Sequence, residues 1–191
     1  MINLAIFASG TGSNARKILE YFQQHDQIRV GLVVSNKSTA GVLAIAESFG
    51  VPTLVVKRST FYEGEGCVHT LNEYHIDWVI LAGFLWLVPG YLLERYPGKI
   101  INIHPALLPS FGGKGMYGMH VHEAVKAAGV LETGITIHTI DEEYDRGEVL
   151  FQERVSVHPN DTTQEIAAKV LALEHRYFAE VIEKTILSSL I

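Results

Sequence analysis

The sequence predicts an α/β protein with a Rossmann-like, open twisted sheet that is mostly parallel, carries helices on both faces and ends in an antiparallel C-terminal hairpin. In the first half, short apolar runs typical of buried strands alternate with segments of helical spacing. In the second half, residues 133–139 and 149–156 alternate between apolar and polar side chains, as paired antiparallel strands do. The whole chain, residues 1–191, is expected to form a single domain.

Apolar runs and glycine positions divide the first half into strands and helices. Residues 57–66 are polar and contain glycine, which predicts a loop over the sheet edge. Right-handed crossovers are expected to connect the parallel strands. The expected strands are residues 4–8, 28–34, 52–56, 78–81 and 99–104, and the expected helices are residues 15–24, 41–49, 67–74 and 90–96.

The second half is expected to contain two helices besides the hairpin. One helix is predicted at residues 120–128, and a long amphipathic helix at residues 163–187 has Asn160 or Asp161 near its start. The glycine-rich segment 110–118 is a candidate lid. Four residues are expected to share one face of the long helix: Ile166, Val170, Leu173 and Tyr177.

The composition predicts a large core and restricts the class of partner. Hydrophobic residues make up 48% of the chain, and the formal net charge of −6 argues against non-specific binding to nucleic acid or acidic membranes. Cys67 is the only cysteine, which predicts neither a disulfide framework nor a thiolate zinc site. The opening MINLAIFASGTG lacks the basic region of a signal peptide, and no apolar run approaches about 18 residues. We therefore expect a cytoplasmic protein that binds neither nucleic acid nor membranes.

Two polar residues, Asn102 and His104, interrupt an apolar strand in the segment KIINIHPALLPSF, residues 99–111. Their spacing of two places both side chains on one face, near the carboxyl end of the strand, where ligands bind in open α/β sheets. An amide beside an imidazole suits acyl transfer, because one can stabilise an oxyanion while the other handles a proton. Alternatively, Asn102 caps the strand end and His104 is a hydrogen-bonded core histidine.

A glycine-rich turn, SGTGSN at residues 9–14, follows the first expected strand and precedes a helix. Such a turn directs backbone N–H groups and a helix N-terminus at one point, which favours a phosphate group. A structural alternative is a tight turn in which Ser13 or Asn14 caps the helix. The spacing of Gly10, Gly12 and Ala15 also fits a dinucleotide fingerprint, but the second strand ends at Ser-Asn-Lys without the carboxylate that NAD requires.

The fourth expected strand leads into an apolar loop, AGFLWLV at residues 82–88. This loop would suit a flat aromatic ligand that is held by backbone groups. Alternatively, Phe84 and Trp86 pack under the following helix, residues 90–96.

The connection between the hairpin strands carries four acids in five residues, Asp141, Glu142, Glu143 and Asp145, and a solvated turn accounts for Glu142 and Glu143. The fourth, Asp145, precedes Arg-Gly and could point inward. In that position it would favour the protonated imidazole of His104 and orient the ring.

These stretches together resemble the phosphoribosylglycinamide formyltransferases, a folate-dependent family of purine synthesis, over nearly the whole chain. The specific parts are SGTGSN, the AGF of residues 82–84, NIHPALLP at residues 102–109, and an H-x6-D-x-G run that starts at His138. NIHPALLP is shared with other formyltransferases and a deformylase, so the glycine-rich loop is the narrower signal.

The resemblance implies a site, a co-substrate and a substrate. Asn102, His104 and Asp145 would be the catalytic set, 10-formyltetrahydrofolate the co-substrate, and glycinamide ribonucleotide the acceptor, with no metal and with the chain a monomer or homodimer. Where the family often has an arginine for the folate's glutamate tail, this chain has Thr60. Substrate binding is implied for Gly10, Thr11, Gly12, Ser13, Asn14, Gly83 and Glu174, of which Gly12, Ser13 and Asn14 would hold the phosphate and Glu174 the ribose. Co-substrate binding is implied for Leu85, Trp86, Leu87, Val88, Asn102, Ile140, Asp141 and Asp145.

The residues alone leave two other classes of function open. One is an NADP-binding oxidoreductase, because Lys37 could bind a 2′-phosphate, and the other is a nucleotide-binding module without catalysis. A metal hydrolase is disfavoured. His120 and His122 form the only close histidine pair, and without an H-E-x-x-H motif we expect them to be polar residues at a helix start.

Overall fold

The protein is described here by a computed structural model, which covers residues 1–63, 67–141 and 147–190. The chain divides into two compact units, Met1–Ile101 and Asn102–Ile191, and the following paragraphs take each unit by itself.

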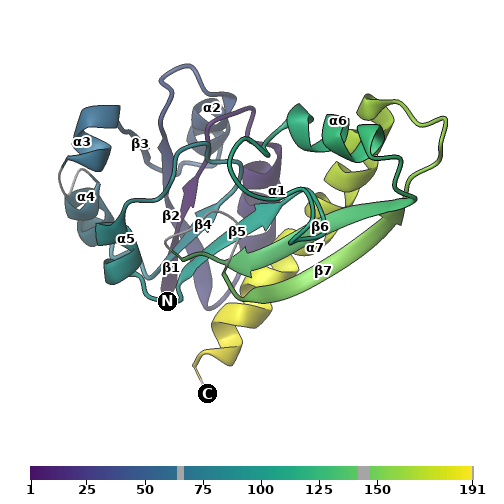
Figure 1. The fold of residues 1–191 in the computed structure, drawn as a ribbon. Helices are drawn as coiled ribbons and strands as arrows, with labels where there is room; N and C mark the ends of the chain where they lie inside the picture. The colour runs from purple at the N-terminus through teal and green to yellow at the C-terminus, as the bar shows by residue number, and fades with distance from the viewer. Residues whose placement is uncertain (64–66, 142–146, 191) are drawn as a thin grey trace. The chain divides into compact units, whose positions relative to one another are not determined.

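The first unit is built on parallel strands that are connected through helices (Figure 1). Residues 3–7 of its central strand are all buried, which explains why this strand is apolar at nearly every position. Ile6 of that strand pairs with Val33 on one side and with Ile80 on the other. In chain order the elements are β1 (Ile2–Phe7), α1 (Ser13–Phe22), β2 (Ile28–Ser35), α2 (Gly41–Ser48), β3 (Thr53–Val55), α3 (Arg58–Tyr62), α4 (Val68–Glu73), β4 (Trp78–Leu81), α5 (Gly90–Arg95) and the start of β5 (Ile100–His104).

The short helix α3 corrects the prediction of a polar loop at residues 57–66. Its sequence RSTFY is polar except for its last two residues, so it shows no helical periodicity. The helix exists because Phe61 is fully buried and packs its ring 5.6 Å from Phe84. Tertiary packing of one aromatic side chain therefore overrides a weak local preference.

The second unit combines an antiparallel strand pair with two helices. It contains the end of β5, then α6 (Met119–Ala127), β6 (Glu132–Thr139), β7 (Val149–Ser156) and α7 (Thr163–Ser188). β6 and β7 pair in the register Thr136 to Gln152. Gly134 permits the close approach of these strands, because a Cβ atom there would lie 1.9 Å from the carbonyl oxygen of Glu153.

Together the seven strands follow the order β3-β2-β1-β4-β5-β6-β7. The pairs among β1, β2, β3 and β4 are parallel, and the pair of β6 with β7 is antiparallel. The predicted α/β class, a mostly parallel sheet with an antiparallel C-terminal pair, is confirmed.

Helix α7 packs along β6 and β7 within the second unit and is drawn in yellow in Figure 1. Leu173 and Tyr177, which were predicted on its buried face, are only half-buried. No helix within the described ranges, the 26-residue α7 included, combines the length and apolar character that a bilayer crossing requires. The buried stripe runs in steps of four through Ile166, Val170, Glu174, Phe178, Ile182 and Ile186.

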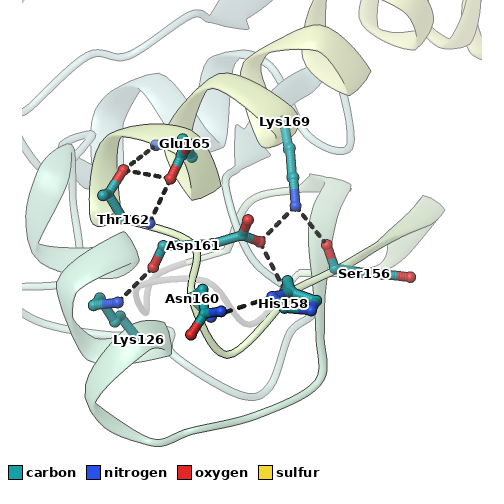
Figure 2. A network of polar contacts seen from close by, with 8 residues as sticks. All are labelled: Lys126, Ser156, His158, Asn160, Asp161, Thr162, Glu165 and Lys169. Carbon is teal, nitrogen blue, oxygen red and sulfur yellow. Dashed lines mark hydrogen bonds and ion pairs between the residues drawn. The ribbon is translucent and has the colours of Figure 1, made fainter.

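A polar network fixes the start of α7 (Figure 2). The cap is Thr162, which follows the Asn160 and Asp161 that the sequence places near the helix start, and it forms a capping box with Glu165. Asp161 accepts hydrogen bonds from Lys169 and from the backbone N–H of His158, and these contacts hold the pKa of its carboxyl below the ordinary value. The network therefore satisfies the first N–H groups of α7 and joins the helix start to the end of β7.

We expect Thr162→Ala to lower the free energy of unfolding by about 1 kcal/mol, because the Glu165 N–H loses its acceptor. Urea denaturation followed by circular dichroism measures the change. Thr163→Ala, one position into the helix and outside the box, is the matched control and should change stability by less than about 0.5 kcal/mol. Equal losses in the two variants would contradict the assignment of Thr162 as the cap.

Candidate active site

Asn102 and His104 lie in the second half of β5, as predicted, with Asn102 half-buried and His104 only 3% exposed. The isoleucines around them are buried, so the strand is held by its apolar residues and the two polar side chains are the exceptions. Side chains two positions apart on a strand share a face. The two groups thus leave the same face of β5 at its carboxyl end.

His104 is oriented by the loop that follows it. Its Nε2 lies 2.8 Å from the carbonyl oxygen of Phe111, and because a carbonyl only accepts, this nitrogen carries the hydrogen. Phe111 has a left-handed backbone, with φ +56, and its ring packs against the cluster of Val125, Val157 and Ile166. The second residue of the predicted lid, residues 110–118, therefore has an anchored side chain and a carbonyl that contacts His104.

Asn102 contacts His138 of β6, a residue that the sequence presented only as part of a motif. The amide Nδ2 of Asn102 lies 3.0 Å from Nε2 of His138. On the other side of the ring, Nδ1 of His138 lies 2.7 Å from the carbonyl oxygen of Thr139. His138 is 0% exposed, so this chain of contacts is shielded from water.

The hydroxyl of Thr136 fixes the loop directly after His104. It donates to the carbonyl oxygen of Ala106 at 2.7 Å and accepts from the backbone N–H of Leu108 at 2.9 Å. Gln152 of β7 donates both to this hydroxyl at 2.9 Å and to the carbonyl oxygen of Leu108 at 3.0 Å. The loop is thereby hydrogen-bonded to both strands of the hairpin, which sequence reasoning did not detect, because threonine and glutamine are common in strands.

The two neighbouring histidines of α6 have separate environments. His120 is exposed and lies 3.3 Å from Glu123. His122 is only 7% exposed, and its Nδ1 has no hydrogen-bond partner in the described part of the chain. Burial lowers the pKa of His122, and positive charge on His104 lowers it further. Both histidines lie at the start of α6, as predicted, but His122 is buried there and His120 is not.

The remaining predicted residues of the second unit are placed as follows. Glu174 is 9% exposed in the middle of the apolar stripe of α7, a position at which an ionisable group is rare. Ile140 is half-buried and Asp141 exposed, just after β6. Asp145 lies outside the described residues, so its predicted contact with His104 stays a prediction.

In the first unit, the glycine-rich turn leaves the start of α1 without a side-chain cap. Gly12 is the N-cap, with φ +83, and its carbonyl accepts from the N–H of Arg16 at 2.8 Å. The alternative in which Ser13 or Asn14 caps the helix is therefore wrong. The first turn contains no acidic residue. Uncapped N–H groups at a helix start favour an anion, which supports the interpretation as a phosphate loop.

Ser9 ties this turn to the loop that follows β4. Its backbone N–H donates to the carbonyl oxygen of Gly83 at 3.1 Å, and its buried hydroxyl accepts from the N–H of Leu85 at 2.9 Å. The loops predicted to bind substrate and co-substrate are thus hydrogen-bonded to each other within the first unit.

The apolar loop after β4 packs through its aromatic side chains. Phe84 lies 5.3 Å from Phe7, and Trp86 lies 5.5 Å from Phe61. Phe84 and Trp86 therefore pack within the protein, with Phe61 of α3 as a shared partner, whereas the predicted packing under α5 stays a prediction. The loop also holds residues that do not pack in this way, because Gly83 is exposed and the side chain of Leu85 is 43% exposed.

Val88 is buried, and the carbonyl oxygen of Leu87 accepts from the hydroxyl of Tyr62 at 3.0 Å.

Burial raises the pKa of the Cys67 thiol to about 11. Its hydrogen bond with Tyr91 has a smaller, opposing effect on the pKa, so this thiol is protonated at neutral pH. Among residues 1–63, 67–141 and 147–190, no group of three or more histidine, cysteine, aspartate or glutamate side chains is arranged to hold a metal ion.

Comparison with known proteins places the chain in a family. The chloroplastic phosphoribosylglycinamide formyltransferase of Arabidopsis thaliana is 45% identical over 185 residues, covering 94% of this chain and 63% of the relative. This chain therefore spans less than two thirds of that plant protein. The phosphoribosylglycinamide formyltransferase of Bacillus subtilis is 33% identical over 190 residues, covering 96% of this chain and 94% of the relative.

A solved structure shows the same fold. The phosphoribosylglycinamide formyltransferase of Streptococcus pneumoniae superposes with a TM-score of 0.85 at 36% identity, covering 97% of this chain and 99% of the other. Residues 2–182 also match the formyl transferase family as a whole. This chain therefore belongs to the formyl transferase family.

Proposed function

We propose that the chain transfers a formyl group from 10-formyltetrahydrofolate to the amino group of glycinamide ribonucleotide, a step of purine biosynthesis. The observation that carries the proposal is the pair of Asn102 and His104 at the carboxyl end of β5. The chain that holds this pair matches the phosphoribosylglycinamide formyltransferase of Bacillus subtilis over nearly its whole length. Its partners would be these two small molecules. The absence of nucleic-acid, membrane and metal binding, a cytoplasmic location, a single domain, and a monomeric or homodimeric state stay predictions.

Substrate binding would begin at the glycine-rich turn. The uncapped N–H groups at the start of α1, with the side chains of Thr11, Ser13 and Asn14, would donate to the ribonucleotide phosphate. The buried Glu174 would accept from the ribose hydroxyls, which would account for a carboxylate on an apolar stripe. Gly10 and Gly83 would contribute backbone groups.

The folate would be held mainly by backbone groups. Residues 85–87 leave part of their surface exposed, although the ring of Trp86 is packed against Phe61. The main chain of residues 85–88 would therefore contact a flat pterin ring. Asn102, Ile140, Asp141 and Asp145 would complete the binding of the co-substrate.

Catalysis would proceed by direct attack. The amine nitrogen forms a bond to the formyl carbon, and the π electron pair moves to the formyl oxygen. The nitrogen then loses a proton, the electron pair on the oxygen re-forms the carbonyl as the bond from carbon to N10 breaks, and N10 keeps that bond pair and accepts a proton. Asn102 and protonated His104 would stabilise the negative oxygen, and Asp145 would keep His104 charged and receive the amine's proton through water. No enzyme nucleophile is required, in agreement with the protonated state of Cys67.

An assay with both substrates tests the proposal. Purified protein is mixed with glycinamide ribonucleotide and a 10-formyl folate, and release of the deformylated folate is followed by absorbance. We expect release that depends on the ribonucleotide. Release without the ribonucleotide would indicate a hydrolase, and tight NADPH binding without folate binding would indicate an oxidoreductase.

We expect Asn102→Ala and His104→Ala each to lower the turnover number by at least about 100-fold, because each removes a donor to the oxyanion. Binding of the ribonucleotide, measured by calorimetry, should stay within about threefold of wild type, because the phosphate loop belongs to other residues. His69→Ala, which changes an exposed histidine of α4, is the matched control and should keep full turnover. Near-normal turnover of either catalytic variant would remove that residue from the mechanism.

We expect Gly12→Ala to weaken binding of the ribonucleotide by about tenfold or more. The new Cβ would lie 2.8 Å from Cα of Val42, and φ +83 is strained for alanine, so the turn must move. Folate binding should change little. Gly50→Ala, which imposes alanine on φ +68 with open space around it, controls for strain alone. Unchanged ribonucleotide affinity in Gly12→Ala would contradict the phosphate role of the loop.

A further inference from the structure

We propose that His138 is a positioning residue that determines which end of the Asn102 amide faces the reacting groups. The inference rests on the formyl transfer proposed above and extends the role of Asn102 in it. It is carried by two hydrogen bonds on opposite sides of one buried ring.

The first hydrogen bond determines the tautomer of His138. Its Nδ1 lies 2.7 Å from the carbonyl oxygen of Thr139, and a carbonyl oxygen has no hydrogen to donate. Nδ1 must therefore carry the hydrogen. A neutral imidazole has one N–H, so Nε2 presents a lone pair and can only accept.

Through the second hydrogen bond, the tautomer of His138 determines the orientation of the Asn102 amide. The group that faces Nε2 at 3.0 Å must be a donor, and the amide meets this requirement with Nδ2. Turning the amide by half a rotation would place the lone pairs of Oδ1 against the lone pair of Nε2. The opposite tautomer of His138 would favour that turned amide.

Burial of His138 strengthens the preference for this tautomer and for this orientation of the Asn102 amide. His138 is fully buried, so no bulk water can replace a lost partner, and an unsatisfied buried polar group costs about 1–3 kcal/mol. The neighbours of His138 on β6 support this shielding, because Ile135 and Ile137 are also fully buried. The tautomer and the amide orientation are therefore fixed before any substrate binds.

The orientation leaves Asn102 with two different functions toward a ligand. One Nδ2 hydrogen is engaged by His138, so the second Nδ2 hydrogen and the Oδ1 acceptor remain for the reacting groups. During attack the formyl oxygen gains negative charge and needs a donor, while the amine nitrogen gains positive charge and carries hydrogens that need an acceptor. The turned amide would direct both Nδ2 hydrogens toward the ligand and use one Oδ1 lone pair on His138, which suits the oxygen better than the amine.

The tautomer can be measured in the wild-type protein without any assay of activity. Long-range proton–nitrogen correlation spectra of uniformly labelled protein distinguish a protonated ring nitrogen from one with a lone pair. The chain has nine histidines, and the signals of His138 are those that vanish in His138→Asn. We expect Nδ1 to be protonated and Nε2 to be unprotonated at neutral pH. A protonated Nε2 would overturn the proposal even if formyl transfer is confirmed.

Two variants separate positioning from mere structure. The amide of His138→Gln reaches the position of Nε2 and can accept through Oε1, whereas the amide of His138→Asn reaches only the position of Nδ1. We expect His138→Asn to lower kcat by about tenfold, the equivalent of one hydrogen bond, with KM for the ribonucleotide within about twofold. His138→Gln should recover most of that loss. Equal losses in the two variants would contradict the proposal.

A double-mutant cycle with Asn102→Ala completes the test. When the amide is absent, His138→Asn should cost less than about twofold in kcat, because nothing remains to be positioned. An equal cost in both backgrounds would show that His138 acts independently of Asn102. Circular dichroism checks that each variant folds. If His138→Asn does not fold, the kinetics of His138→Gln and the wild-type spectra decide whether His138 positions Asn102. Absence of formyl transfer in wild type would instead refute the proposed function, and the spectra would still judge the tautomer.

Discussion

A backbone carbonyl oxygen can accept a hydrogen bond but never donate one, and this constraint organises the polar centre of the second unit. The carbonyl of Thr139 requires a hydrogen on Nδ1 of His138, and the carbonyl of Phe111 requires one on Nε2 of His104. Both rings are buried, so water does not compete for these contacts. The backbone of β6 and of the loop after β5 therefore sets the hydrogens of two imidazoles in advance. A polar group whose orientation is fixed in advance costs no reorganisation when charge develops beside it, which is the basis of electrostatic catalysis.

The carbonyls can do this only because their own positions are held by packing. Thr136 and Gln152 connect the loop after His104 to the hairpin through three hydrogen bonds, and a fourth joins the two side chains. Further along the loop, the left-handed backbone of Phe111 is unfavourable by about 1 kcal/mol, and contact of its ring with the apolar cluster of Val125, Val157 and Ile166 offsets that cost. The structure thus stabilises a strained backbone at the point where its carbonyl meets the imidazole.

The sequence predicted the strands well because buried strands require apolar runs, and it predicted Asn102 and His104 because polar residues inside such a run stand out. It did not predict α3, whose single buried aromatic ring leaves no periodicity to detect. It also did not predict the roles of Thr136 and His138. Leu108, a partner of Thr136, is 28 residues away in the chain, and Asn102, a partner of His138, is 36 residues away; threonine also has the β-branched side chain that a strand favours in any case. Contacts over such separations have no local signature, so only the folded chain reveals them.

At Glu174, the periodicity of the helix and the chemistry of the side chain give different expectations. Steps of four along α7 assign its position to the core, between Val170 and Phe178, where an apolar side chain would stabilise the helix packing. Burial of a carboxylate costs free energy unless the group is hydrogen-bonded or paired, so an acid at this position depends on polar contacts that an apolar side chain would not need. The same argument applies to Asn102 among the isoleucines of β5. At both positions the periodicity of the element favours an apolar side chain and the sequence supplies a polar one, and local conflicts of this kind are typical of functional sites.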